Sequence, residues 1–457
     1  MSTAPPTRTS VPRDPTTLDG DFAEFAAEVR AALGRHGVPG GAIALHYYGR
    51  QWATGIGVTN VDHPLPADES TIFQAGGITK LITALAVLRL AARGQLELDN
   101  PVRAYWPALR LADSRVAERV TVRHLLNHTA GWYGDDLGSG EDGPDALARY
   151  VLRLETAAQL LPLGGPFSYN DSAFSLAGRL IEIVTGQPFA KAIQTLVFEP
   201  LGMIRSSFFA RDVLTMRHAV GHEVSNGRAR VNPGWTTVPR VLDPAGGLCA
   251  SALDLLQFGR AMLGGWPAHE PLSEETLAAL REPTSDVGVL GREDLAGFAA
   301  GTMIWQADDG RYYGQVGSTQ FQNCRLVYHP EADFALVMMT NGSTGELAIA
   351  DVLPRALEQY TGIVLGSPPL LDIPAPAEYS GRFGFADSKL GPAYTVTVRD
   401  GVLRADLAGE TRLALIRRDT VVAVEGPARG SRAEFVRDLF GGIGWFRLGG
   451  RAYPRLR

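Results

Sequence analysis

The sequence predicts an α+β fold: an antiparallel sheet flanked by helices, with an inserted helical subdomain, followed by a second, all-β domain. Strand-like segments stand near both ends of the first 365 residues, and helical patterns fill most of the region between them. This order differs from the regular alternation of strands and helices that a parallel sheet requires. Residues 366–376 are rich in proline and indicate a linker, which separates residues 21–365 from an all-β domain at 377–457.

The first predicted element follows a proline- and threonine-rich segment, residues 1–20, which we expect to be a mobile tail. Beyond this tail, apolar residues recur at helical spacing and predict a helix through Phe22, Phe25, Val29 and Leu33. Residues 42–49 and 51–58 flank a turn and predict a β-hairpin. A long apolar helix is predicted at 79–93, because a glycine that can stop it follows directly.

The remaining elements of the first domain change from helical to extended. Residues 100–285 show mostly helical patterns, interrupted by loops that are rich in glycine and proline. Strand patterns then return in four segments, which are 301–305, 312–316, 325–328 and 334–340. A closing helix is predicted at 347–360. In the second domain, residues 394–398 alternate and meet Asp400-Gly401, a typical hairpin turn.

Composition excludes several classes of protein. The chain of 457 residues is 45% hydrophobic and 20% charged, which is typical of globular proteins. Its net charge of −6 and its lack of a basic block give no reason to expect nucleic acid. No apolar run approaches the roughly 20 residues of a membrane span. The N-terminus has no apolar signal segment, so we expect a cytoplasmic protein without membrane contact.

Metal and cofactor sites are not expected either. The two cysteines, Cys249 and Cys324, can form no disulfide framework and lack the spacing of metal ligands. There is no glycine-rich phosphate loop of the right spacing. The sequence therefore predicts no cofactor and no metal.

Lysine is rare in this chain, which draws attention to Lys80. Of the 43 basic residues only Lys80, Lys191 and Lys389 are lysines. Lys80 opens the helix predicted at 79–93, and apolar residues follow it on every face. Burying an ammonium group costs free energy unless the charge is paired. Two interpretations are open: a solvated lysine at a helix end, or a buried lysine whose pKa is tuned by its surroundings.

Five further segments carry a family resemblance. They are Val38-Pro39-Gly40, Ser70-Thr71-Ile72-Phe73, the run from His124 to Gly131, the run from Phe198 to Met203, and Pro244-Ala245-Gly246-Gly247-Leu248. Together with the Lys80 helix they resemble, in the same order, the serine β-lactamase and penicillin-binding-protein superfamily of the class C, esterase, D-peptidase and thioesterase kind. The resemblance covers about residues 22–360. It implies a β-lactamase-like fold for 21–365, and the last domain resembles the lipocalin-like barrel that such proteins often carry.

The resemblance implies a Ser-x-x-Lys motif, in which the lysine takes the proton of a serine one helical turn earlier. Gly77 stands where that serine belongs. Glycine has no side chain and cannot be acylated. Thr79 precedes the lysine directly and therefore points away from this helix face, so it is a poor substitute. The nucleophile of the family is missing.

Two further motifs of the family are altered. The Tyr-x-Asn motif reads Tyr169-Asn170-Asp171, and a carboxylate near Lys80 would hold the lysine protonated. The Lys-Thr-Gly or His-x-Gly motif reads Gln315-Val316-Gly317, is followed by Ser318, and is one residue shorter than usual. We therefore predict Lys80 and Tyr169 as catalytic residues, and as substrate-binding residues Gly77, Asp171, Gln315, Gly317 and Ser318. His124 and His128 are expected to be structural.

Three functions remain open at this stage. The first is a serine hydrolase, thioesterase or acyltransferase that is inactivated at position 77, natively or by design. The second is a non-catalytic relative that binds a ligand. The third is a repurposed enzyme. We favour the last, because a missing nucleophile coincides with a retained Lys80 and Tyr169 couple in a lysine-poor chain. Such an enzyme of small-molecule or peptide biosynthesis, that is, secondary metabolism, would cyclise or isomerise its substrate by acid–base chemistry. Gly77 would then leave space for a substrate atom, while the oligomeric state and the role of the second domain stay open.

Overall fold

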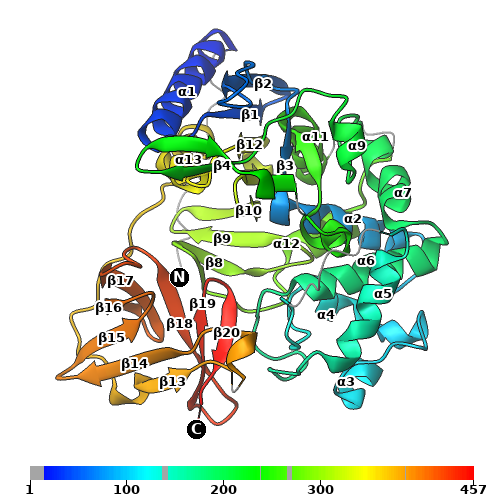
Figure 1. Ribbon diagram of the computed structural model, residues 1–457. Coiled ribbons are helices and arrows are strands. Elements are labelled where there is room, and N and C mark those ends of the chain that lie inside the picture. The colour runs from blue at the N-terminus through cyan, green and yellow to red at the C-terminus, as the bar shows by residue number, and fades with distance from the viewer. Residues whose placement is uncertain (1–14, 136–142, 237, 265–269, 386, 457) are drawn as a thin grey trace, which may run out of the picture.

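The computed structural model describes residues 15–135, 143–236, 238–264, 270–385 and 387–456 (Figure 1). Within these ranges the chain forms a mixed domain that is built on one large sheet, and a second domain that is built on another. Residues 362–376, between the two domains, contain no helix or strand. No helix within the described ranges has both the length and the apolar character that crossing a membrane demands.

The first domain contains an antiparallel sheet of eight strands in the order β2-β1-β12-β11-β10-β9-β8-β7. The strands are β1 (Gly40–Tyr47), β2 (Arg50–Gly57), β7 (Val289–Leu290), β8 (Glu293–Phe298), β9 (Met303–Ala307), β10 (Gly310–Ser318), β11 (Asn323–His329) and β12 (Phe334–Thr340). The early hairpin joins the late strands because β1 pairs with β12, with Ala44 opposite Val337. This arrangement confirms the predicted antiparallel α+β sheet.

Both faces of the sheet are covered by helices, as the alternation along β12 shows. Leu336 and Met338 lie in the same apolar core as α1 (Pro15–Arg35) and α13 (Gly345–Thr361). Val337 and Met339 lie in the core on the opposite face, with α2 (Thr79–Ala92) and α11 (Ala252–Leu263). Alternate residues of a strand point to opposite faces, so a strand covered on both sides is apolar throughout.

The helical subdomain lies beside the sheet and encloses α2 (Figure 1). Its other helices are α3 (Ser114–Arg119), α4 (Val122–Leu126), α5 (Ala146–Leu152), α6 (Asp171–Thr185), α7 (Phe189–Ile193), α8 (Glu199–Leu201), α9 (Ala210–Val213), α10 (Asp243–Gly246) and α12 (Glu274–Arg281). Two short sheets accompany them, β3 (Ile72–Gln74) with β6 (Cys249–Ser251) and β4 (His222–Ser225) with β5 (Arg228–Val231). Every residue of α2 from Thr79 to Leu90 is buried, because the helix packs on all sides.

The second domain is a lipocalin-like barrel of eight antiparallel strands in sequence order, β13 to β20. They are β13 (Gly381–Phe383), β14 (Tyr394–Arg399), β15 (Val402–Asp406), β16 (Glu410–Arg417), β17 (Thr420–Glu425), β18 (Arg432–Arg437), β19 (Ile443–Leu448) and β20 (Arg451–Pro454). A bridge between Phe383 and Arg455 brings the two edges together. The predicted turn at Asp400-Gly401 has φ values of 51° and 76°, as a tight hairpin requires.

Two parts of the predicted organisation are corrected, one boundary and one pair of strands. The predicted mobile tail, residues 1–20, is too long, because α1 already begins at Pro15 and Leu18 is buried; residues 1–14 lie outside the described residues. Strands β7 and β8 have no counterpart among the predicted strands, which resume only at residue 301. Strand β7 has only two residues, and β8 begins with two acidic residues, so neither shows a clear strand pattern.

Candidate active site

A cavity of about 670 Å³ opens where the first turn of α2, the start of α6, strand β10 and the second domain meet. Five of the seven predicted site residues line it: Gly77, Lys80, Tyr169, Asp171 and Ser318. They come from three separate stretches of the sequence. The fold therefore brings most of the predicted site together.

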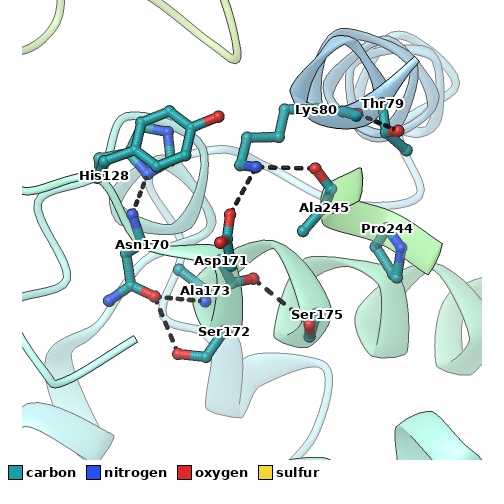
Figure 2. A network of polar contacts seen from close by, with 12 residues as sticks. Thr79, Lys80, His128, Asn170, Asp171, Ser172, Ala173, Ser175, Pro244 and Ala245 are labelled. Atoms are coloured by element: carbon teal, nitrogen blue, oxygen red, sulfur yellow. Dashed lines mark hydrogen bonds and ion pairs between the residues drawn. The ribbon is translucent and has the colours of Figure 1, made fainter. Parts of the chain in front are cut away.

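Lys80 is the buried cation of this cavity, with 2% of its side chain exposed. Its Nζ lies 2.6 Å from Oδ1 of Asp171 and donates a hydrogen bond of 2.8 Å to the carbonyl oxygen of Ala245, as Figure 2 shows. The ring centroid of Tyr169 is 4.5 Å away. Burial lowers the pKa of Lys80, but Asp171 and Tyr169 together outweigh burial, so the pKa lies above its ordinary value. Lys80 is therefore a buried, paired ammonium group.

The start of α6 places Tyr169 and Asp171 side by side. Asn170 caps the helix, because its side chain accepts a hydrogen bond of 2.8 Å from the N–H of Ala173. Asp171 is then the first residue of the helix, where a negative charge is favourable. Burial raises the pKa of the Tyr169 phenol, although Lys80 opposes this. Near neutral pH both Lys80 and Tyr169 therefore carry a proton.

Gly77 lies in the 3₁₀ turn Gly76–Ile78 that leads into α2. A Cβ built on Gly77 would lie 2.7 Å from the carbonyl oxygen of Val316 and 2.9 Å from the hydroxyl of Tyr169. Real Cβ atoms do not approach other atoms this closely. The phenol of Tyr169 therefore fills the place that we expected Gly77 to leave for a substrate atom, although Gly77 itself lines the cavity.

The third motif is placed differently from the prediction. Val316 and Ser318 on β10 line the cavity, whereas Gln315 and Gly317 point to the other face of the strand. Gln315 is fully buried, donates to the carbonyl oxygen of Gly301 at 2.9 Å and accepts from the N–H of Val316 at 3.0 Å. Gly317 packs against the main chain of Ala75. Neither residue lines the cavity, because strand alternation directs them away from it.

His128 supports Tyr169 from behind, in the structural role that the sequence predicts. Its ring stacks on the Tyr169 ring with centroids 4.4 Å apart, and its Nδ1 accepts from the N–H of Asn170 at 3.0 Å. Burial holds the pKa of His128 well below its ordinary value, and the charges of Lys80 and Arg451 lower the pKa further. The ring is therefore neutral.

This neutral ring predicts an acid-sensitive fold. Because the pKa of His128 is lower in the folded than in the unfolded chain, stability is full above about pH 6.5 and falls by up to about 1.4 kcal/mol per pH unit below it. His128→Asn keeps an acceptor and suits the positive φ of 61°. Denaturant unfolding between pH 5 and 8 should show a shallower acid slope for His128→Asn than for the parent. Equal slopes would contradict this assignment, since the other histidines contribute equally to both proteins.

The second domain also contributes to the cavity, which the sequence did not predict. The two-residue turn between β19 and β20 is Gly449-Gly450, with φ values of 56° and 80°, and Gly449 lines the cavity. The carbonyl oxygen of Gly450 accepts from the N–H of Tyr169 at 2.8 Å. Arg451, the next residue, donates to the carbonyl oxygen of Tyr169. A Gly-Gly pair between two alternating segments identifies this turn in the sequence. The pair does not reveal that the turn lies beside Tyr169 in the folded chain.

No group of three or more metal-ligating side chains occurs within the described ranges. Both cysteines are free thiols, and burial raises the pKa of Cys249 to about 12.

Comparisons with known proteins show which family and which fold this chain shares. The Beta-lactamase family model matches residues 25–359. Penicillin-binding protein 4 of Amycolatopsis lactamdurans is 28% identical over 349 residues, which are 75% of this chain and 91% of that protein. Esterase EstB of Burkholderia gladioli is 34% identical over 224 residues, 45% of this chain and 57% of the esterase. The crystal structure of SurE with D-Leu is 26% identical with a TM-score of 0.78 and covers 96% of this chain and 100% of its own, so both domains are included.

Proposed function

Because the chain belongs to the Beta-lactamase family but lacks a side chain at position 77, we propose an enzyme that forms no acyl-serine. Lys80 and Tyr169 act as its proton donors. One observation carries the proposal: the Lys80 ammonium lines the cavity while it is held by Asp171 at 2.6 Å. A buried cation that is kept in contact with a cavity suits proton donation to a ligand better than it suits a purely structural role.

The raised pKa values favour acid rather than base duty. Lys80 and Tyr169 both hold their protons near neutral pH, so they can hydrogen-bond to a substrate carbonyl or to a leaving group. Asp171 neutralises the lysine and is available to take a proton from the substrate. General acid–base catalysis contributes roughly 10²–10⁴-fold, which is sufficient for a reaction that needs no covalent intermediate.

We propose a peptide or small-molecule ester or thioester as the substrate class. The names of the relatives, a penicillin-binding protein and an esterase, and the D-Leu in the SurE structure support this class. In a cyclisation the amine of the substrate attacks its own activated carbonyl. A C–N bond forms, the C–O or C–S bond breaks, and Lys80 protonates the departing oxygen or sulfur while Asp171 takes the proton of the amine.

Tyr169→Phe tests the proposal. A linear peptide thioester that ends in D-leucine is the probe, and product formation is followed by liquid chromatography and mass spectrometry. We expect turnover to fall about 10²-fold or more in Tyr169→Phe, because a proton donor at the cavity is lost. Tyr313→Phe, on β10 but outside the cavity lining, should keep full turnover. Full activity of Tyr169→Phe, or an acyl adduct in the intact mass of the working enzyme, contradicts the proposal.

Ligand binding without turnover is the second candidate, and the contacts of Lys80 favour it. Asp171, the Ala245 carbonyl and the Tyr169 ring already satisfy this ammonium group. A pure binder would release the unchanged peptide thioester and would bind it equally well after Lys80→Met.

A further inference from the structure

Arg451 links the second domain to two residues that line the cavity, Tyr169 and Asp171. It begins β20, directly after the turn that lines the cavity. Its Nε donates to Oδ2 of Asp135 at 2.9 Å, and its other nitrogens contact Oδ1 of Asp135 and the carbonyl oxygen of Tyr169. Its guanidinium also lies 5.3 Å from the centroid of the Tyr169 ring.

The main chain of Tyr169 is therefore held by the barrel on both sides. Its N–H donates to Gly450 and its carbonyl accepts from Arg451. One residue earlier, the hydroxyl of Ser168 accepts from the N–H of Ala452 at 3.2 Å. Because these bonds fix the backbone from which the phenol projects, the position of Tyr169 depends on the docked barrel.

Arg451 also takes part in a row of alternating charges. Lys80 contacts Oδ1 of Asp171 at 2.6 Å, and Arg451 lies 3.9 Å from Oδ2 of the same carboxylate. Asp135 completes the row on the other side of Arg451. The row contains two cations and two anions, so its net charge is zero. Loss of the Arg451 charge leaves the row negative, whereas loss of the Asp135 charge leaves it positive.

We propose that Arg451 is a positioning residue of the site, which fixes the backbone of Tyr169 and shares the carboxylate of Asp171 with Lys80. The inference rests on the proposed function only in giving Lys80 and Tyr169 the role of proton donors. It assigns the second domain a part in the site: the docked barrel sets both the place of the phenol and the charge around the ammonium group.

Other contacts keep the barrel docked when Arg451 changes. Arg432 lies 2.6 Å from Asp294 on β8, and Arg447 donates to the carbonyl oxygen of Phe167 at 3.1 Å. The N–H of Gly288 donates to Glu434 at 3.0 Å. Variants at position 451 are therefore expected to fold with both domains in place.

Two variants separate charge sharing from simple bracing. Arg451→Met and Asp135→Asn break the same ion pair. If Arg451 only holds the backbone in place, both variants should therefore change the reactivity of Lys80 in the same direction. Charge sharing predicts opposite changes in the free-amine fraction of Lys80. The other titratable groups that face Lys80 are Asp171 and Tyr169 in contact, with His128 behind the phenol. All three are unchanged in both variants.

Acetylation with acetic anhydride at pH 9 measures this fraction. Peptide mass spectrometry then compares Lys80 with the exposed Lys191 and Lys389, the two other lysines of the chain. We expect Lys80 to react about tenfold more slowly in Arg451→Met and about tenfold faster in Asp135→Asn, the effect of one unit of pKa. Arg451→Lys retains the charge and should react like the parent.

Equal or parallel changes in the two variants would overturn the inference, as would a rate for Arg451→Lys that matches Arg451→Met. If Arg451→Met does not fold, the two remaining variants still test the inference. Lys80 must be acetylated faster in Asp135→Asn than in the parent, and at the parent's rate in Arg451→Lys. The acetylation assay needs no turnover. If the two variants change the reactivity of Lys80 in opposite directions but the protein shows no catalysis, the inference holds and the proposed function fails. If Tyr169→Phe loses turnover but the opposite changes are absent, the proposed function holds and the inference fails.

Discussion

Gly77→Ser alone is expected to stay almost unlabelled by a β-lactam or a fluorophosphonate, whereas Gly77→Ser combined with Asp171→Asn gains the adduct. In both variants the new side chain must displace the Tyr169 hydroxyl and the Val316 carbonyl. Asp171 also keeps Lys80 protonated, so the amine cannot take the proton of the serine. Asparagine at 171, as in the family motif, removes that charge. Each unit by which the pKa of Lys80 then falls gives tenfold more free amine, and we expect about 10²-fold faster labelling.

Intact-mass spectrometry over a time course checks this prediction. The parent and Asp171→Asn alone serve as controls, since neither has a serine at position 77. Rapid labelling of Gly77→Ser alone would contradict it. The chain would then be a hydrolase or acyltransferase that lacks only its nucleophile, as a native loss or a designed knockout would leave it.

Lys80→Met is expected to abolish most turnover and to destabilise the first domain by about 3 kcal/mol. Breaking a buried pair leaves an uncompensated charge, which costs about 3–5 kcal/mol. The low end applies because 22% of the Asp171 side chain is exposed and Arg451 faces its second oxygen. The pKa of Lys80 is raised on folding, so this stabilisation is full below about pH 10.5 and is lost as the pH rises through the folded value.

The matched control is Lys80→Met with Asp171→Asn. It removes both charges and should recover most of the lost stability but none of the turnover, because only the proton donor is missing. Urea unfolding and the peptide-thioester assay measure the two effects separately. If Lys80→Met kept full turnover, Lys80 would have no acid role. If it lost turnover and the double variant regained it, the defect would be one of stability alone.

The sequence predicted those parts of the site that depend on local patterns. Strand β12 occupies the residues expected from its apolar run, and the buried lysine paired with Asp171 is one of the two interpretations that the apolar neighbours of Lys80 left open. Gln315 was misplaced because a motif gives a position along the strand but not the face to which each side chain points. Arg451 was missed because its contact with Tyr169 spans 282 positions and depends on how two domains dock.

The pairing of β1 with β12 has a consequence for the order in which the molecule is made. Strand β1 cannot pair with β12 until residues near 340 have left the ribosome, since Gly41 pairs with Thr340. Such long-range contacts make folding slow and expose strand edges in the meantime. Tyr169 waits longer still, because its last two main-chain partners are Gly450 and Arg451. During synthesis the phenol of Tyr169 is therefore among the last groups to reach its place, after both domains have formed.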